Sequence, residues 1–144
     1  MQSVIRTGIA GFALASFMAL GASAFAEEMK FKVDLTGAEE VPPVETSATG
    51  TADITYDSES KMLSWTVENS GLSGDVTAAH FHGPAAVGEN AGPLVPIEIA
   101  NLAKGEATLD DAAATALTEG KLYLNLHTAA NPDGEVRGQV MAAE

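Results

Sequence analysis

The fold is decided by one stretch near the C-terminus, Leu122-Tyr123-Leu124-Asn125-Leu126-His127-Thr128, which returns through Glu135-Val136-Arg137-Gly138-Gln139. Leucine occupies every second position of the first segment, which is the period of a β-strand. Between the two segments stands Asn131-Pro132-Asp133-Gly134, a tetrapeptide typical of a type I turn with Pro second and Gly fourth. The stretch therefore predicts an antiparallel hairpin.

The same alternation recurs upstream. It predicts strands near residues 31–35, 51–56, 63–67 and 76–82, and an edge strand over 94–99, where Pro96 cannot donate to a ladder. Residues 110–118 are Ala-rich behind Asp110 or Asp111 as N-cap, which predicts one short helix. About seven short strands with one short helix predict an all-β, immunoglobulin-like antiparallel β-sandwich. The expected core follows from the period-2 positions: Leu35, Ile54, Leu63, Trp65, Val67, Phe81, Leu122, Leu124, Leu126, Val136 and Val140.

The N-terminus has the pattern of a secretory signal peptide. Arg6 precedes the apolar residues 9–20, and Ala24-Phe25-Ala26 offers an A-x-A cleavage site, with Ala22-Ser23-Ala24 as a second candidate. We therefore predict a cleaved segment over residues 1–26 and one domain over 27–144. The protein is expected to be extracytoplasmic, either periplasmic or secreted, without a transmembrane anchor in its mature form.

Composition excludes some classes of function. The chain has 20 Asp and Glu against 7 Lys and Arg, for a formal net charge of −13, which argues against nucleic-acid binding. It has no Cys, so a blue-copper centre with a thiolate ligand is excluded.

The chain has only three histidines, and they are the candidate metal ligands. His80 and His82 share one face of a predicted strand, and His127 lies on another strand. Imidazole suits copper and zinc; copper is the first choice of cofactor because it stands higher in the Irving–Williams order, and zinc is the second. The alternative is that all three are ordinary structural residues. The H-x-H spacing resembles copper–zinc superoxide dismutase, but three histidines are too few for its two-metal site.

Four further residues are candidates for outer-shell support of the ligands: Tyr123, Asn125, Glu135 and Arg137. Tyr123 and Asn125 share the His127 face, although they are equally well explained as solvent-facing strand residues. Arg137 is expected to pair with a carboxylate and thereby fix the hairpin. Asp133 and Glu135 are possible calcium ligands, but the turn explains the segment without an ion.

Several motifs together resemble the chordin-type domain family, called CHRD. They are Leu35-Thr36-Gly37-Ala38-Glu39-Glu40-Val41-Pro42-Pro43, Gly50-Thr51-Ala52, Ala79-His80-Phe81-His82-Gly83-Pro84, Gly88-Glu89-Asn90-Ala91-Gly92 and the C-terminal hairpin. The resemblance implies an extracytoplasmic domain with an all-β, immunoglobulin-like fold. It implies no particular biochemical activity, and the single copy here argues against the antagonist role of the tandem domains of chordin.

These observations predict an exported binding protein that coordinates a divalent metal through His80, His82 and His127, rather than an enzyme. The alternative is a metal-free extracytoplasmic module that binds a protein or cell-surface partner. Convergence of the three imidazoles would favour the metal, and dispersed imidazoles would favour the interaction module.

Overall fold

The computed structural model describes residues 26–143, so all but the last residue of the predicted signal peptide lies outside the described residues. Nine strands are present: β1 (Glu28–Thr36), β2 (Thr49–Asp57), β3 (Met62–Ser70), β4 (Val76–His82), β5 (Pro93–Ile97), β6 (Lys104–Thr108), β7 (Tyr123–Thr128), β8 (Val136–Gln139) and β9 (Met141–Ala142). The helices are α1 (Asp111–Thr118) and two 3-10 turns, η1 (Gly37–Glu39) and η2 (Ile99–Asn101). No helix of this part of the chain is long and apolar enough to cross a membrane.

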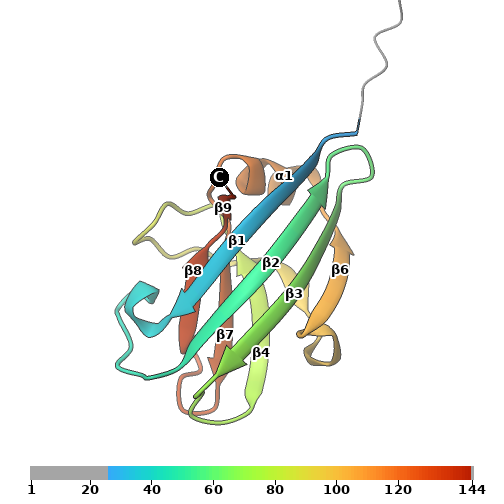
Figure 1. The fold of residues 1–144 in the computed structure, drawn as a ribbon. Coiled ribbons are helices and arrows are strands. Elements are labelled where there is room, and N and C mark those ends of the chain that lie inside the picture. The colour runs from blue at the N-terminus through green and yellow to red at the C-terminus, as the bar shows by residue number, and fades with distance from the viewer. Residues whose placement is uncertain (1–25, 144) are drawn as a thin grey trace, which may run out of the picture.

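The strands form a single antiparallel sheet in the order β5-β4-β7-β8-β1-β2-β3-β6, with β9 paired to β1 (Figure 1). The sheet curls into a nearly closed barrel. The all-β class with one helix is confirmed, but the expected sandwich of two sheets and seven strands is wrong in detail. The physical reason is that β1 continues the ladder into the other half of the molecule, through Thr36 opposite Arg137 and through β9.

Strands β6 and β9 carry too weak a pattern to be read from the sequence. The inward positions of β6 are Gly105 and Ala107 rather than large apolar residues. Gly105 is small because the Trp65 ring occupies the space beside it: a Cβ atom there would lie 2.6 Å from the indole. The strand thus fits around a core side chain and does not fill the core itself. Strand β9 has only two residues.

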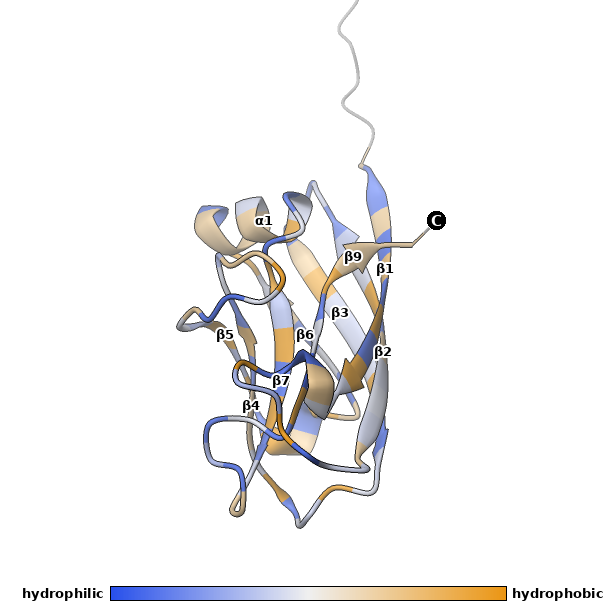
Figure 2. Cartoon of the chain, turned by 90° about the vertical axis from the view of Figure 1, so that its left-hand side faces the viewer, coloured by the Kyte–Doolittle hydropathy of each residue, from blue (hydrophilic) through white to orange (hydrophobic). Residues whose placement is uncertain are grey.

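The core lies between the two halves of the curled sheet, with α1 at one end (Figure 2). All eleven residues predicted for the core are buried, none more than 4% exposed. Trp65 packs edge-on against Phe81, with ring centroids 5.6 Å apart, and its indole N–H donates to the Asn101 carbonyl. The period-2 pattern thus identified the apolar interior correctly.

Three local predictions are also confirmed. Strand β5, which contains Pro96, is at one edge of the sheet. Asp110 is the N-cap of α1, and its carboxylate accepts from the Ala113 N–H. The turn after β7 closes with the Gly134 N–H donating to the Asn131 carbonyl.

Strand β7 is buried on both faces, which the sequence did not indicate. All six of its residues are buried, including His127 and also Tyr123 and Asn125, for which a solvent-facing position was the alternative. Residues 37–48 and 83–92 cover this second face, and Asn90 joins these two segments by donating to the Val41 carbonyl. The interior therefore has an apolar core on one side of β7 and a polar layer on the other.

Glu135 holds one end of this polar layer together. The carboxylate is fully buried and accepts hydrogen bonds from the Thr46, Thr128 and Ser73 hydroxyls and from the Ser73 backbone N–H. Burial alone would raise the pKa of this carboxyl, but the hydrogen bonds from Ser73, Thr128 and Thr46 outweigh it and lower the pKa to about 2. Glu135 therefore connects the segments around residues 46 and 73 to the β7–β8 hairpin.

We predict that Trp65→Ala lowers the free energy of unfolding by about 3–5 kcal/mol, because it removes a large buried side chain and leaves a cavity. Denaturant unfolding at pH 7 measures the loss. Val87→Ala is the matched control, since Val87 is 64% exposed and its truncation should leave the midpoint unchanged. Equal midpoints for Trp65→Ala and the wild type would contradict the assignment of Trp65 to the core.

Glu135→Gln is expected to lower the free energy of unfolding by about 1–3 kcal/mol at pH 7. The amide of Gln would place N–H groups against the donors that face a carboxylate in the wild type. The pKa of Glu135 is lowered in the fold, so its contribution is complete above the usual value of 4.5 and is lost as pH falls toward about 2. Unfolding measured from pH 7 to pH 2.5 should show this loss in the wild type and a smaller loss in Glu135→Gln. Glu68→Gln, at an exposed position of β3, is the control. An acid profile for Glu135→Gln identical to that of the wild type would contradict the prediction.

Candidate metal centre

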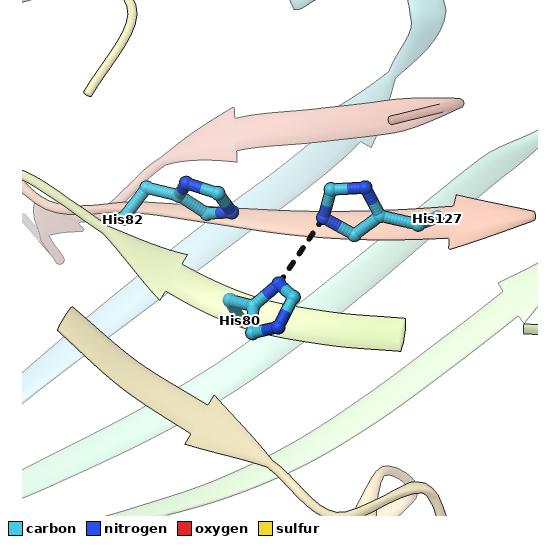
Figure 3. Close-up of side chains that lie close together, drawn as sticks. All are labelled: His80, His82 and His127. Carbon is cyan, nitrogen blue, oxygen red and sulfur yellow. Dashed lines mark hydrogen bonds between the residues drawn. The ribbon is translucent and has the colours of Figure 1, made fainter. Parts of the chain in front are cut away.

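The three histidines come together on the polar face of two neighbouring strands. His80 and His82 alternate along β4, and His127 lies on β7 directly opposite Ala78. The β4–β7 register places His127 diagonally across from His80, on the same face of the sheet (Figure 3). The i, i+2 spacing and the strand pairing therefore produce the convergence that the metal hypothesis requires.

The geometry is close to that of a coordination site. One ring nitrogen of each histidine lies within 4.8 Å of the corresponding atoms of the other two. His80 Nδ1 and His127 Nε2 are 3.2 Å apart (Figure 3). Two nitrogen ligands bonded at 2.0–2.1 Å to one tetrahedral ion stand about 3.4 Å apart. Small rotations of the side chains would therefore bring all three nitrogens to bonding distance from a single ion.

Backbone carbonyls from the covering loops fix the orientation of two of the rings. His82 Nδ1 lies 3.0 Å from the Ala91 carbonyl oxygen, and His127 Nδ1 lies 3.0 Å from the Pro132 carbonyl oxygen. A carbonyl oxygen only accepts, so each Nδ1 carries the proton and each Nε2 carries a lone pair. The lone pair of His127 Nε2 faces His80 Nδ1, whereas that of His82 Nε2 faces no donor among residues 26–143. This is the arrangement that an outer shell imposes on metal-binding histidines.

His82 Nε2 is the most informative atom of the cluster. It is buried and has no hydrogen-bond partner. A buried polar atom without a partner costs free energy, about 1–3 kcal/mol, so a native structure retains one for a reason. Here the unpaired atom carries a lone pair, and it lies on the face where the other two imidazoles converge.

The environment of His80 and His82 favours their neutral form. Burial lowers the pKa of His80 below its usual value of 6.5, and repulsion from His127 lowers it further. Burial also lowers the pKa of His82, against the opposing hydrogen bond to Ala91 and with added repulsion from His80, His127 and Arg137. Neutral imidazoles are the form that binds metals.

Tyr123 and Arg137 support the cluster from one side. The Tyr123 ring stacks on the His82 ring with centroids 4.9 Å apart and planes 7° apart, and its hydroxyl donates to the same Ala91 carbonyl. The Arg137 guanidinium lies over the Tyr123 ring, 4.1 Å from its centroid. It donates to the Asn90 side chain and the Glu89 carbonyl, and it forms no ion pair within residues 26–143, contrary to the expected carboxylate partner.

Asn125 and Glu135 lie in the same polar layer but have other partners. The Asn125 amide and the Glu40 carboxyl lie beside each other at Gly134. The Glu135 carboxylate accepts hydrogen bonds from the Ser73, Thr46 and Thr128 donors described above. Neither side chain is hydrogen-bonded to a histidine among the described residues.

Sequence reasoning missed the groups that orient the rings. Ala91 and Pro132 act through backbone carbonyls, which leave no trace in side-chain chemistry, and Asn90 connects Arg137 to the loop that contains Ala91. The available signal was indirect: both carbonyls belong to Gly- and Pro-containing segments next to the histidine strands.

A comparison with protein families matches the CHRD domain over residues 31–140. The matched region contains all three histidines, both covering segments and strands β2–β8 in full. No curated protein matches the chain, and no solved structure does. Because the match spans most of the sequence, the chain belongs to the CHRD domain family.

Proposed function

We propose that this protein is an extracytoplasmic module that binds a divalent metal ion through His80, His82 and His127, with Cu(II) as the favoured ion and Zn(II) as the second. The observation that carries the proposal is the orphaned, buried Nε2 of His82, which is aimed at two other imidazoles. An ion at that point would satisfy the lone pair and replace the His80–His127 contact with two metal bonds.

The donor set supports copper or zinc over harder ions. Three neutral nitrogens suit Cu(II) and Zn(II), whereas Ca²⁺ and Mg²⁺ prefer oxygen ligands. Three protein ligands also leave a coordination position open, which is compatible with exchange of the ion or of a fourth ligand. Copper is favoured over zinc by its place in the Irving–Williams order.

The cellular placement follows from the family and the N-terminus. The CHRD match and the predicted signal peptide support export, to the periplasm or the medium. The acidic chain, with its formal net charge of −13, would attract cations to its surface.

Calorimetry with Cu(II) and with Zn(II) tests the site. The wild type is expected to bind one ion per chain, and each of His80→Ala, His82→Ala and His127→Ala should weaken binding at least tenfold, because each removes one of three ligands. Tyr123→Phe keeps the ring stack but loses the hydroxyl, so it should change affinity less than any ligand variant.

Two results would refute the proposed function. One is a wild type that takes up neither ion at micromolar concentration. The other is a set of histidine variants that bind as well as the wild type, which would place the ion elsewhere. The metal-free interaction module would then be the better interpretation of the chain.

Metal affinity should decrease on acidification, because protons and the ion compete for the same lone pairs. The pKa values of His80 and His82 are lowered in the fold, so competition at these two rings is expected to begin below pH 6.5, the usual value for histidine. Competition titrations with a chromogenic chelator at intervals from pH 8 to pH 5 would measure this. Loss of affinity between pH 8 and 7 that tracks protonation of either ring in NMR spectra would contradict the prediction.

A further inference from the structure

Besides His82 Nε2, two further orphaned polar atoms lie in the polar layer. Glu40 Oε1 and Asn125 Oδ1 are both buried, and neither has a hydrogen-bond partner in the described part of the chain. Glu40 is 5% exposed and Asn125 is 3% exposed. Both orphaned atoms are oxygens, so as an ionised carboxylate and an amide carbonyl they offer four lone pairs and no proton to each other.

Gly134 makes room for this pair. A Cβ atom on Gly134 would lie 2.5 Å from Asn125 Oδ1 and 2.6 Å from Glu40 Oε1. The two oxygens therefore flank the bare side of the same glycine, whose φ of 128° also disfavours any side chain. The turn residue that closes the β7–β8 hairpin is thus also the residue that lets Glu40 approach Asn125.

We propose that Glu40 and Asn125 form a proton-dependent latch, in which protonated Glu40 donates its O–H to Asn125 Oδ1 while the Asn125 amide donates back to the Glu40 carboxyl. The protonated pair satisfies both orphaned oxygens. The ionised pair leaves the Asn125 oxygen unpaired beside a buried negative charge.

The surroundings of Glu40 favour its protonated form, as the latch requires. Burial raises the pKa of Glu40 to about 7, and the nearby Arg137 guanidinium and the Asn125 hydrogen bond offset that rise only in part. The other charged or titratable groups around Glu40 are Asp133, which lines the same groove from the turn, Glu39 and Glu45, which are exposed on the covering segment, and His127, two residues beyond Asn125 on β7. Of all these groups, Arg137 alone has a charge that contributes to the shift.

The latch controls how residues 37–48 lie on the strands beneath them. Glu40 follows η1, and its neighbours 41–44 face residues 130–134 across a groove of about 270 Å³. The same segment is held by the Val44 N–H to Gly37 carbonyl bond and by Asn90 at the Val41 carbonyl. Acidification should tighten this cover, and a rise in pH through the pKa of Glu40 should loosen it.

The direction of this pH effect follows from the linkage between proton binding and closure of residues 37–48. A carboxyl whose pKa is higher in the closed state than in the open state stabilises closure fully below its ordinary value of 4.5. That contribution is lost as pH rises toward about 7, and above that pH the stability of the closed state no longer changes. The opening constant should therefore rise about tenfold per pH unit in that interval, since one pKa unit is a tenfold change in equilibrium.

Carbon-13 NMR of the side-chain carboxyls in the purified, metal-free protein tests the first step. The resonance that disappears in Glu40→Gln should titrate in the wild type with a midpoint near 7. A midpoint at or below 4.5, or no titration at all down to acid unfolding, would overturn the proposal. The midpoint is read from the wild type, and triple-resonance assignment of the wild type identifies the Glu40 carboxyl independently of the variant.

Hydrogen exchange tests the second step. After correction for intrinsic exchange, protection of the Val44 N–H should fall between pH 4.5 and 7 in the wild type and stay constant in Glu40→Gln, which cannot titrate. Glu39→Gln, at the exposed neighbouring position, should retain the wild-type profile. Protection that is independent of pH in the wild type would overturn the latch, as would an identical pH profile in Glu40→Gln.

Discussion

Burial of β7 on both faces is the constraint on which the rest of this structure depends. A strand with one wet face can leave its polar side chains to water, but β7 has Tyr123, Asn125 and His127 on a face that residues 37–48 and 83–92 cover. Each polar group there must find a partner inside the protein. The covering segments supply these partners largely through backbone carbonyls, such as those of Ala91 and Pro132.

The same constraint explains why two buried carboxyls of one layer behave in opposite ways. Glu135 receives hydrogen bonds from three residues, and its pKa falls to about 2 despite full burial. Glu40 has one oxygen without any donor, and its pKa rises to about 7. Burial raises the pKa of both carboxyls; the hydrogen bonds outweigh it at Glu135, whereas Arg137 and Asn125 offset it only in part at Glu40. Glu135 therefore stays ionised and hydrogen-bonded at neutral pH, whereas the contact of Glu40 with Asn125 depends on protonation.

The histidine cluster follows the same logic with a different outcome. The Nδ1 atoms of His82 and His127 are satisfied by carbonyls, while the Nε2 atom of His82 has no partner within residues 26–143. The layer therefore concentrates its unsatisfied polar atoms in two places, the imidazole cluster and the Glu40–Asn125 pair. These are the places where an ion and a proton, respectively, would complete the hydrogen-bonding and coordination of the interior.

The sequence by itself determined the positions of the strands other than β6 and β9, the apolar core and the three histidines as a group. Alternation reports directly on which face of a strand is apolar, and a chain with only three histidines leaves no other imidazole ligands to consider. Tertiary structure alone decided that β1 joins the two halves into one curled sheet, because strand order depends on pairings between distant segments. It alone decided that the second face of β7 is covered, that Ala91 and Pro132 orient the rings, and that Glu40 meets Asn125 across Gly134. These contacts join loops to strands through backbone atoms and a missing Cβ, and such features have no period and no side-chain chemistry for a sequence to display.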